Sequence, residues 1–497
     1  MADGFIAGQA QLAAQSHSGG SPVGVDRNAG GAPCVLPARA ARKGRQAGRL
    51  CYSNDMAEFF KQAPAPESLQ KRLFDSIFHK QSVVGSFPLS TPLTPLYAFP
   101  AMMLSGLAIV LCVDDFALRR NLDAIRAAGY DAPDVLGLGG EATAAHQQSV
   151  FEEINRQRAR LLFVTPESFC SFRFLPVLAR ERVSFLAIED AHRLLPGYGE
   201  SRGEDRALQT LGALRQKPPL ALFSAPLSDA RRNALLRRVS ASNGLISSRE
   251  TFYAVQETPS LSQTRLSAQL ALTERQKFNA LCRTLAGVVG KGNMGGLFRV
   301  GSALIRARDA RSANALLTRL HRVGFESLFA YHDRLPSAER ERVAHAYATQ
   351  RNAIVVAHGP CDRMLLPPPQ DASKILYWQF PVSLEEALAQ LFQVRENESR
   401  AVEGVIFYTR DDYQEALSRA QWAQAPTPGA QALKTARIQS IRLARQWLLS
   451  DACRVQGLLR RALPEWGDDA GPCGLCDVCA SHARGGFLRG ALRHWLY

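Results

Sequence analysis

The sequence predicts two successive α/β domains, each built on a doubly wound parallel sheet, followed by a small helical subdomain that carries four cysteines. Short apolar runs alternate with amphipathic helical stretches over residues 56–245, and the same alternation is repeated over residues 246–425. Such alternation is typical of parallel sheets that are covered by helices on both faces. From residue 426 the strand-like runs cease, and only helical patterns continue through residues 426–482.

Each predicted strand is a short, mainly apolar run, as expected for strands that are buried on both faces. In the first domain these runs are Leu107–Val113, Arg160–Thr165, Ser184–Ile188 and Leu220–Ser224. In the second domain they are Ser302–Arg306, Ser327–Ala330, Ala353–Ala357, Ile375–Gln379 and Gly404–Tyr408. The predicted helices are Ala117–Ala128, Gln147–Arg158, Ala310–Val323, Ser337–Ala348, Leu384–Gln393, Ala430–Leu449 and Asp451–Ala462.

The terminal segments, the net charge and the scattered cysteines indicate which partner and which cellular compartment the chain has. Residues 1–55 are rich in Gly, Ala, Ser and Gln without apolar periodicity, which predicts a disordered tail, and residues 483–497 form a basic tail. A net charge of +15 favours nucleic acid as the partner. No apolar run reaches about 18 residues, so we expect no membrane span. Scattered cysteines without a signal peptide predict reduced thiols in a cytoplasmic or nucleoid-associated protein.

Four cysteines near the end of the chain have the spacing of a metal site. Cys473, Cys476 and Cys479 are separated by two residues each, and 19 residues lie between Cys453 and Cys473. Thiolates two residues apart can bind one tetrahedral Zn²⁺, and a distant fourth sulfur closes the site. Because four sulfur ligands leave no open position, the sequence predicts a structural zinc. Free or disulfide-linked cysteines are the alternative.

A pair of acidic residues follows one of the buried strands. The stretch Phe185-Leu-Ala-Ile-Glu-Asp-Ala-His192 runs from apolar residues into Glu189, Asp190 and His192. Open α/β sheets bind ligands at the carboxyl ends of their strands. In nucleotide-driven enzymes this position holds Mg²⁺ and orients the attacking water. Glu189, Asp190 and His192 are therefore catalytic candidates, and a solvated loop start is the simpler interpretation.

The cysteine stretch, Ala452-Cys-Arg-Val-Gln-Gly-Leu-Leu459 followed by Pro472-Cys-Gly-Leu-Cys-Asp-Val-Cys479, resembles the zinc-binding subdomain of RecQ-type DNA helicases. Leu161–Glu167 resembles the family's Ala-Pro-Glu segment, and Glu189–His192 lies at its Asp-Glu-Ala-His box with the two acids exchanged. The resemblance covers about residues 56–482. It implies two RecA-like domains, a zinc subdomain, and ATP-dependent 3′-to-5′ DNA unwinding in DNA repair or recombination.

Several motifs of that family are altered here. In the phosphate-binding stretch Phe87–Thr94, Leu93 replaces the lysine and Pro92 replaces a glycine, although Thr94 keeps the metal-binding hydroxyl. Proline lacks an N–H group and cannot complete a phosphate cradle. The resemblance places Gln70 at the adenine-reading position, so Gln70 and Thr94 are the nucleotide-binding candidates.

The family's other functional loops are altered as well. In the aromatic loop at residues 195–204, Tyr198 can stack on a base and Arg202 keeps its place, which makes them the DNA-binding candidates. The stretch Gln390–Asn397 should supply arginine fingers but retains only Arg395, out of register.

Three hypotheses follow from these departures. The first is a RecQ-like pseudo-helicase that binds single-stranded or junction-containing DNA and has impaired or lost ATP hydrolysis. The second is a divergent but active ATP-dependent 3′-to-5′ DNA helicase that uses ATP and Mg²⁺. The third is a protein-interaction scaffold on a helicase fold, which the net charge of +15 argues against.

Overall fold

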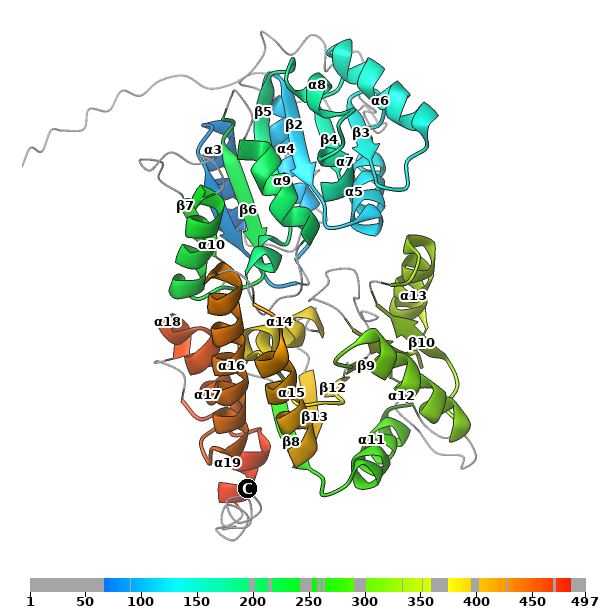
Figure 1. Cartoon of the computed structure of the whole chain (residues 1–497), viewed down its shortest axis with the longest axis vertical. Helices are drawn as coiled ribbons and strands as arrows, with labels where there is room; N and C mark the ends of the chain where they lie inside the picture. Colours follow the sequence, from blue (N-terminus) through cyan, green and yellow to red (C-terminus); the bar gives the residue numbers. More distant parts are fainter. Residues whose placement is uncertain are drawn as a thin grey trace, which may run out of the picture. The chain divides into compact units, whose positions relative to one another are not determined.

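The computed structural model describes residues 67–483, with gaps at 90, 196–201, 213–216, 242–252, 257–260, 262–263, 290–300, 333, 351, 359–373, 395–401, 426–427 and 468–470. Two parallel sheets and a helical subdomain make up this part of the chain (Figure 1). The predicted tails 1–55 and 484–497 lie outside the described residues, as do residues on both sides of the predicted boundary at 245. No described helix is long and apolar enough to cross a membrane.

The first sheet has seven strands in the order β3-β4-β2-β5-β6-β1-β7, and all its pairings are parallel. Its strands are β1 (Val83–Ser86), β2 (Leu107–Leu111), β3 (Val135–Leu138), β4 (Leu161–Val164), β5 (Val183–Ile188), β6 (Leu220–Ser224) and β7 (Tyr253–Gln256). Its helices are α3 (Glu67–Phe78), α4 (Thr94–Met103), α5 (Asp115–Ala127), α6 (Ala144–Asn155), α7 (Pro166–Phe169), α8 (Leu175–Leu178), η1 (Ala191–Leu194, a 3₁₀ helix), α9 (Arg202–Gly212) and α10 (Asp229–Ala241).

The second sheet has six parallel strands in the order β10-β11-β9-β12-β13-β8. Its strands are β8 (Thr264–Leu270), β9 (Ala303–Arg306), β10 (Leu328–Tyr331), β11 (Ile354–Ala357), β12 (Lys374–Tyr377) and β13 (Val402–Tyr408). Its helices are α11 (Glu274–Val289), α12 (Ala310–Arg322), α13 (Ser337–Thr349), α14 (Leu384–Val394) and α15 (Arg410–Trp422).

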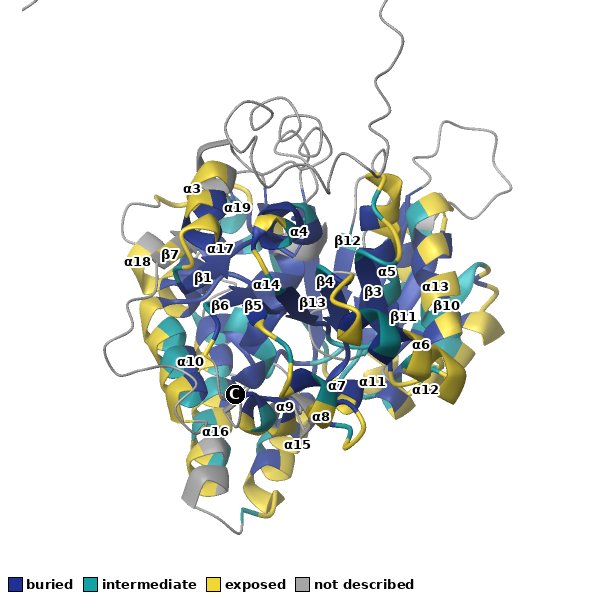
Figure 2. Cartoon of the chain, turned by 90° about the horizontal axis from the view of Figure 1, so that it is seen from above, coloured by how far each residue is buried: buried dark blue, intermediate teal, exposed yellow. Residues whose placement is uncertain are grey.

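The first sheet is buried on both faces, which explains the uninterrupted apolar runs of its central strands. Ile109 and Leu186 contribute to one apolar cluster, whereas their neighbours Val110 and Ala187 contribute to another. Successive strand residues point to opposite faces, so each strand supplies two cores at once. Figure 2 shows the strands as buried and the outer faces of the helices as exposed.

The helical subdomain consists of α16 (Pro428–Leu449), α17 (Arg454–Ala462), α18 (Pro464–Gly467) and α19 (Asp477–Ala483). Trp447 and Leu458 of this subdomain lie in the same apolar cluster as Ile406 of β13. Helices α17 and α19 both contact the edge strand β8. The subdomain therefore covers a sheet edge that would otherwise expose unpaired backbone groups.

The predicted fold class is confirmed, and the nine predicted strands all occur with ends displaced by two residues or fewer. Strands β1, β3, β7 and β8 were not predicted. Gly85 interrupts the apolar run of β1, and Gly137 interrupts that of β3. Neither run was therefore recognised as a strand in the sequence. In each case an added Cβ would come within 2.6 Å of a neighbouring side chain, Phe87 or Leu122, so glycine is needed for close packing.

Candidate nucleotide site and metal centre

The acidic pair lies at the carboxyl end of β5, in the middle of the first sheet. Glu189 is 9% exposed and Asp190 is 5% exposed. Asp190 precedes the short helix η1 with a left-handed backbone, φ 47°. Aspartate adopts this conformation more readily than most residues, because its short side chain can form local hydrogen bonds. The sharp turn at Asp190 thus directs the chain from the strand into η1.

Both carboxylate oxygens of Glu189 accept hydrogen bonds from neutral side chains. The hydroxyl of Tyr97 donates to Oε1 over 2.7 Å, and the amide nitrogen of Asn121 donates to Oε2 over 2.8 Å. Burial, together with the nearby Glu189 carboxylate, raises the pKa of Tyr97 well above its usual value. Tyr97 therefore stays protonated and remains a donor to Glu189.

Thr94 extends this network. Its hydroxyl donates to Oδ1 of Asn121 over 2.6 Å, and it is 5% exposed. Asn121 thus accepts from Thr94 with one end of its amide and donates to Glu189 with the other. The hydroxyl that the sequence predicted as a metal ligand donates its proton to Asn121, and its role at a metal stays a prediction. A continuous buried chain of hydrogen bonds joins α4, α5 and the end of β5.

The loop before α4 provides few groups for holding a phosphate. Its two prolines, Pro88 and Pro92, have no N–H group, and neither has Pro95 in the first turn of α4. The N–H group of Thr91 already donates to the carbonyl of Pro88 over 3.0 Å. Leu93, at the position of the family's lysine, is 3% exposed and packs in the apolar cluster that contains Tyr97. The loop is packed as part of the core.

A small cavity lies beside Glu189. It is lined by Leu111, Cys112, Val113, Pro166, Ile188, Glu189, Leu194, Ala207 and Leu208, and its free volume is about 10 Å³. This volume accommodates about one water molecule. It is far smaller than the several hundred Å³ of an ordinary ligand pocket.

His192 connects the acidic pair to the next strand. It is 0% exposed, and its Nδ1 accepts a hydrogen bond from the backbone N–H of Ala225 over 3.0 Å. Ala225 directly follows β6. The bond requires a lone pair on Nδ1, so the neutral ring carries its proton on Nε2. His192 therefore joins the acidic box to the segment after β6.

The remaining predicted residues are only partly placed. Gln70 lies in α3 and Arg202 begins α9, but their side chains lie outside the described residues, as does Tyr198. Asn121, the centre of the network, was not singled out from the sequence. A buried asparagine on the inner face of α5 is a detectable signal, although its partners cannot be deduced from spacing.

Asn121→Ala is expected to lower the free energy of unfolding by about 1–3 kcal/mol, because it leaves the Thr94 hydroxyl and one Glu189 oxygen buried without this partner. Asn233→Ala, an exposed position in α10, is the matched control and should change stability by less than about 1 kcal/mol. Chemical denaturation measures both. Equal effects of the two substitutions would contradict the importance of the network.

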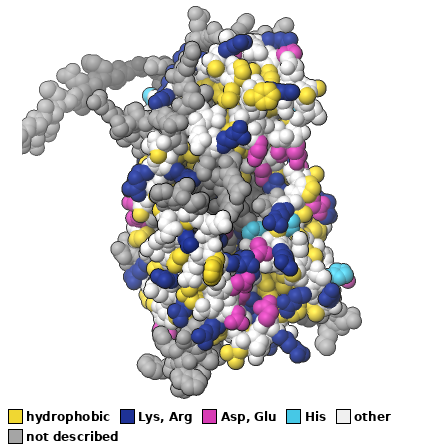
Figure 3. Space-filling model, viewed as in Figure 1, with side chains coloured by type: hydrophobic (Ala, Val, Ile, Leu, Met, Phe, Trp, Pro, Cys, Tyr) yellow, Lys and Arg dark blue, Asp and Glu magenta, His cyan; other side chains and the backbone are white. Residues whose placement is uncertain are grey.

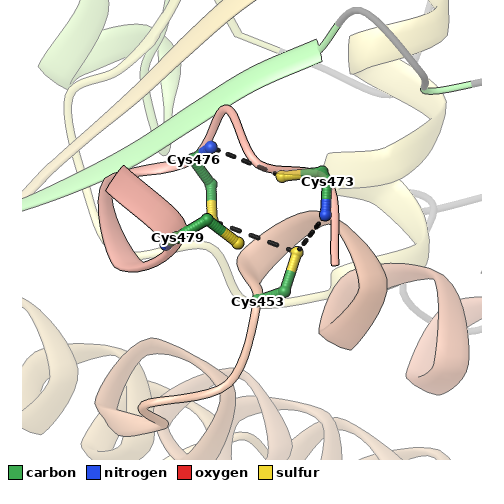
Figure 4. Close-up of side chains that lie close together, drawn as sticks. All are labelled: Cys453, Cys473, Cys476 and Cys479. Atoms are coloured by element: carbon green, nitrogen blue, oxygen red, sulfur yellow. Dashed lines mark hydrogen bonds between the residues drawn. The ribbon is translucent and has the colours of Figure 1, made fainter. Parts of the chain in front are cut away.

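The four predicted cysteines lie together (Figure 4). Their sulfur atoms all lie within 4.8 Å of one another, and the sulfurs of Cys453 and Cys476 are 4.0 Å apart. Four sulfurs around one tetrahedral Zn²⁺, with bonds of about 2.3 Å, would be separated by about 3.8 Å. The donor set and its spacing fit a closed four-sulfur metal site.

Backbone N–H groups point at the sulfurs. The N–H groups of Cys473 and Gln456 donate to Cys453, at 3.3 and 3.5 Å, and those of Cys476 and Cys479 donate to the preceding ligand sulfurs. Burial opposes ionisation of Cys453, but these hydrogen bonds outweigh it and lower the pKa of its thiol to about 7. Such donors stabilise thiolates and orient them toward a metal.

A buried ion pair holds the two halves of the cysteine cluster together. Arg454, next to Cys453, donates to Asp477, next to Cys476, over 2.6 Å. The other oxygen of Asp477 accepts from the backbone N–H of Ala268 in β8. Arg454 also donates to the carbonyl of Leu448. One ion pair therefore links α16, α17, the cysteine turn and the edge of the second sheet.

The burial of Arg454 keeps it from contact with DNA phosphates, because its side chain is fully buried. Arg306 and Arg308 are also largely buried, at 7% and 18% exposed, and Arg308 pairs with Glu415 over 2.6 Å. Figure 3 shows Lys and Arg side chains interspersed with acidic ones on the visible face.

Asp477→Asn is expected to destabilise the protein by about 3 kcal/mol, because it leaves the buried guanidinium of Arg454 without its counter-charge. Asp451→Asn removes an exposed carboxylate from the same subdomain and should have little effect. Thermal unfolding of both variants provides the measurement. A harmless Asp477→Asn would show that the ion pair does not hold the subdomain together.

The fold defined by these sheets is shared with nucleic-acid motors. The structure titled S. cerevisiae Dbp5 bound to RNA and ADP BeF3 matches with a TM-score of 0.57 at 13% identity, over 78% of this chain and 97% of that chain. The DUF1998 helicase MrfA bound to DNA and AMPPNP matches with a TM-score of 0.53 at 12% identity, over 71% and 50%. The two α/β domains therefore have the tandem RecA-like fold of these structures.

Sequence comparison gives a more specific similarity than the fold does. The ATP-dependent DNA helicase RecQ of Pasteurella multocida (strain Pm70) is 24% identical over 385 residues, 77% of this chain and 55% of the relative. RecQ of Haemophilus influenzae is 23% identical over 77% of this chain and 56% of its own length. No family model matches the chain. The chain is thus similar to RecQ helicases, and it spans little more than half the length of these relatives.

Proposed function

We propose that the protein is a RecQ-like DNA-binding pseudo-helicase that has lost ATP hydrolysis. The relatives named ATP-dependent DNA helicase RecQ, and fold neighbours described as bound to RNA or DNA, support a nucleic-acid partner. The net charge of +15 favours a polyanion as well. Single-stranded or junction-containing DNA is the proposed partner, in repair or recombination, and the proposed setting is the cytoplasm or nucleoid.

The hydrogen bonding of Glu189 carries the proposal. Tyr97 and Asn121 donate to the two oxygens of Glu189, which fixes this carboxylate, only 9% exposed, against α4 and α5. The lysine position is a buried leucine, Leu93, and the hydroxyl of Thr94 is directed to Asn121. Restoring the reaction centre would require changes in several elements at once.

A divergent, active 3′-to-5′ helicase is the second candidate. The contact of His192 with Ala225 favours it, because this contact joins the acidic box to the segment that follows β6. In this case the nucleotide would be held by Gln70 and Thr94, with Glu189 and Asp190 at Mg²⁺. Glu189 would then bind the metal through the lone pairs that its bonds to Tyr97 and Asn121 leave open.

The cysteine cluster is proposed to hold a structural Zn²⁺. Cys453, Cys473, Cys476 and Cys479 provide a complete tetrahedral shell without a place for substrate or water. The metal would supply folding free energy to a subdomain of short helices, and it would have no part in a reaction.

Binding of labelled single-stranded DNA, followed by fluorescence anisotropy, tests the proposed function. Affinity should fall at least about tenfold between 50 and 200 mM salt, as expected when about three or more phosphates of single-stranded DNA are neutralised. Addition of Mg-ATP should leave the affinity unchanged. Absence of binding at low salt would favour the scaffold hypothesis, and an affinity that depends on ATP would favour the active helicase.

A further inference from the structure

Helix α13 of the second α/β domain is joined to the first domain by polar contacts along its first turns. The hydroxyl of Ser337 donates to both carboxylate oxygens of Glu141, at 2.8 and 2.7 Å. Arg340, one turn further along, forms an ion pair with Asp114. Glu341 forms an ion pair with Arg119 of α5, with 3.3 Å between its Oε2 and the Nε of the arginine. Three residues of one helix thus engage three residues of the other domain.

The first domain presents these partners in a fixed arrangement. Asp114 caps α5 with its Oδ1, which accepts from the N–H of Ala117, and meets Arg340 with its Oδ2. The N–H of Glu141 donates to Asp115, and an added Cβ on Gly139 would lie 1.8 Å from the same carboxylate. The loop after β3 therefore wraps closely around Asp115, which places Glu141 at the start of α13.

An apolar contact accompanies the polar ones. Phe116 of α5 is 7% exposed and belongs to the apolar cluster that contains Val343 and Tyr347 of α13. Its burial depends on the second domain. The side chain of Arg340 is only 12% exposed and that of Asp114 only 26%, so the ion pair beside Phe116 is partly protected from solvent. Partly buried pairs are screened by salt much less than exposed ones.

A second bridge lies on a different helix of the first domain. Arg231 of α10 pairs with Glu385 of α14 over 3.1 Å. The N–H of Asp229 donates to Glu465 of α18 over 2.7 Å. Near it, Leu89, Ala225 and Ala389 form a small buried cluster that includes both domains. The loop that resembles a phosphate-binding loop therefore contacts α14 directly.

We propose that these contacts form a latch that holds the two α/β domains together without any nucleotide. A ligand can close two domains only through a difference in its affinity for the open and closed states. Here the contacts between side chains of α5 and α13 stabilise the closed state in place of a ligand. The latch replaces nucleotide binding as the determinant of domain closure. It is independent of nucleic-acid binding.

The latch is tested by measuring the distance between fluorophores on the two domains in the full-length protein, without nucleic acid. Exposed Gln148 of α6 and Thr318 of α12 can carry the labels through non-natural amino acids. The wild-type protein should give one narrow distribution of distances, which Mg-ATP leaves unchanged. The double variant Ser337→Ala/Arg340→Ala, and separately Phe116→Ala, should broaden the distribution and shift it to longer distances.

Arg342→Ala is the matched control, because Arg342 pairs with Glu339 of its own helix and is exposed. It should leave the distribution unchanged. Arg119→Glu should broaden the distribution, and adding Glu341→Arg should narrow it again. Unchanged thermal unfolding of each domain would show that the variants are folded. A broad distribution in the wild type, or a double variant that behaves like Arg342→Ala, would overturn the latch. Closed domains without DNA binding would leave the latch intact and refute the proposed function.

Discussion

Saturating single-stranded DNA is expected to leave ATP hydrolysis by the purified protein at background. Three features of the first domain lead to this result: Leu93 replaces a cation, prolines interrupt the phosphate loop, and Glu189 is bonded to Tyr97 and Asn121. The stretch Gln390–Asn397 also lacks arginine fingers in register, and one such arginine raises the rate by a factor of about 10³–10⁵ in well-studied cases. Combined losses of this kind place turnover below detection in a phosphate-release assay.

Leu93→Lys is expected not to restore hydrolysis. The new ammonium would enter an apolar cluster, since Leu93 is 3% exposed, and Glu189 would remain bonded to Tyr97 and Asn121. Burial of an unpaired ammonium costs several kcal/mol, so a loss of stability should accompany the absent activity. Glu189→Gln/Asp190→Asn is the control. Turnover by the wild type that disappears in this control would refute the pseudo-helicase.

Metal analysis is expected to find about one zinc per chain, and loss of that zinc should unfold the helical subdomain. Apparent binding free energies of structural zinc reach about 10–16 kcal/mol in small zinc-dependent domains, and here the metal would join α17 to α19. Cys476→Ser should abolish zinc binding and make residues 428–483 sensitive to protease. Cys282→Ser, a cysteine of α11 outside the cluster, should retain the metal.

The zinc should also be lost on acidification. Metal ligation requires thiolates, so protons compete with zinc as the pH falls. The backbone donors that lower the pKa of Cys453 to about 7 extend the range over which its thiolate persists toward neutral pH. Zinc retention that does not change between neutral and acidic pH, or a subdomain that stays folded after chelation, would contradict the assignment.

The sequence was informative where periodicity and spacing determine structure. Apolar runs revealed the central strands because they are buried on both faces, and the cysteine spacing identified the cluster because three of its four ligands lie within seven residues of one another in sequence. The edge strand β8 was missed, since its pattern alternates between buried and exposed residues. Gly85 and Gly137 concealed two strands for packing reasons that only their neighbours reveal.

The site was predictable only in part. The position of Glu189–His192 at the end of β5 followed from the strand pattern. The partners of Glu189 did not, because Tyr97 and Asn121 come from α4 and α5 and are far from it in sequence. The burial of Arg454 could not be foreseen, because arginines are usually exposed and its partner Asp477 lies in another segment. Long-range pairing of this kind leaves no trace in local spacing.

Nucleotide binding itself tests the central claim most directly. Calorimetric titration of the protein with the magnesium complex of a non-hydrolysable ATP analogue should give no binding heat up to about 1 mM, which corresponds to a binding free energy weaker than about 4 kcal/mol. The account predicts this result because Leu93 replaces the lysine of the phosphate loop, and because Thr94, Asn121, Glu189 and Tyr97 are bonded to one another in a buried network. Stoichiometric binding at micromolar concentration, lost in Glu189→Gln/Asp190→Asn, would contradict it.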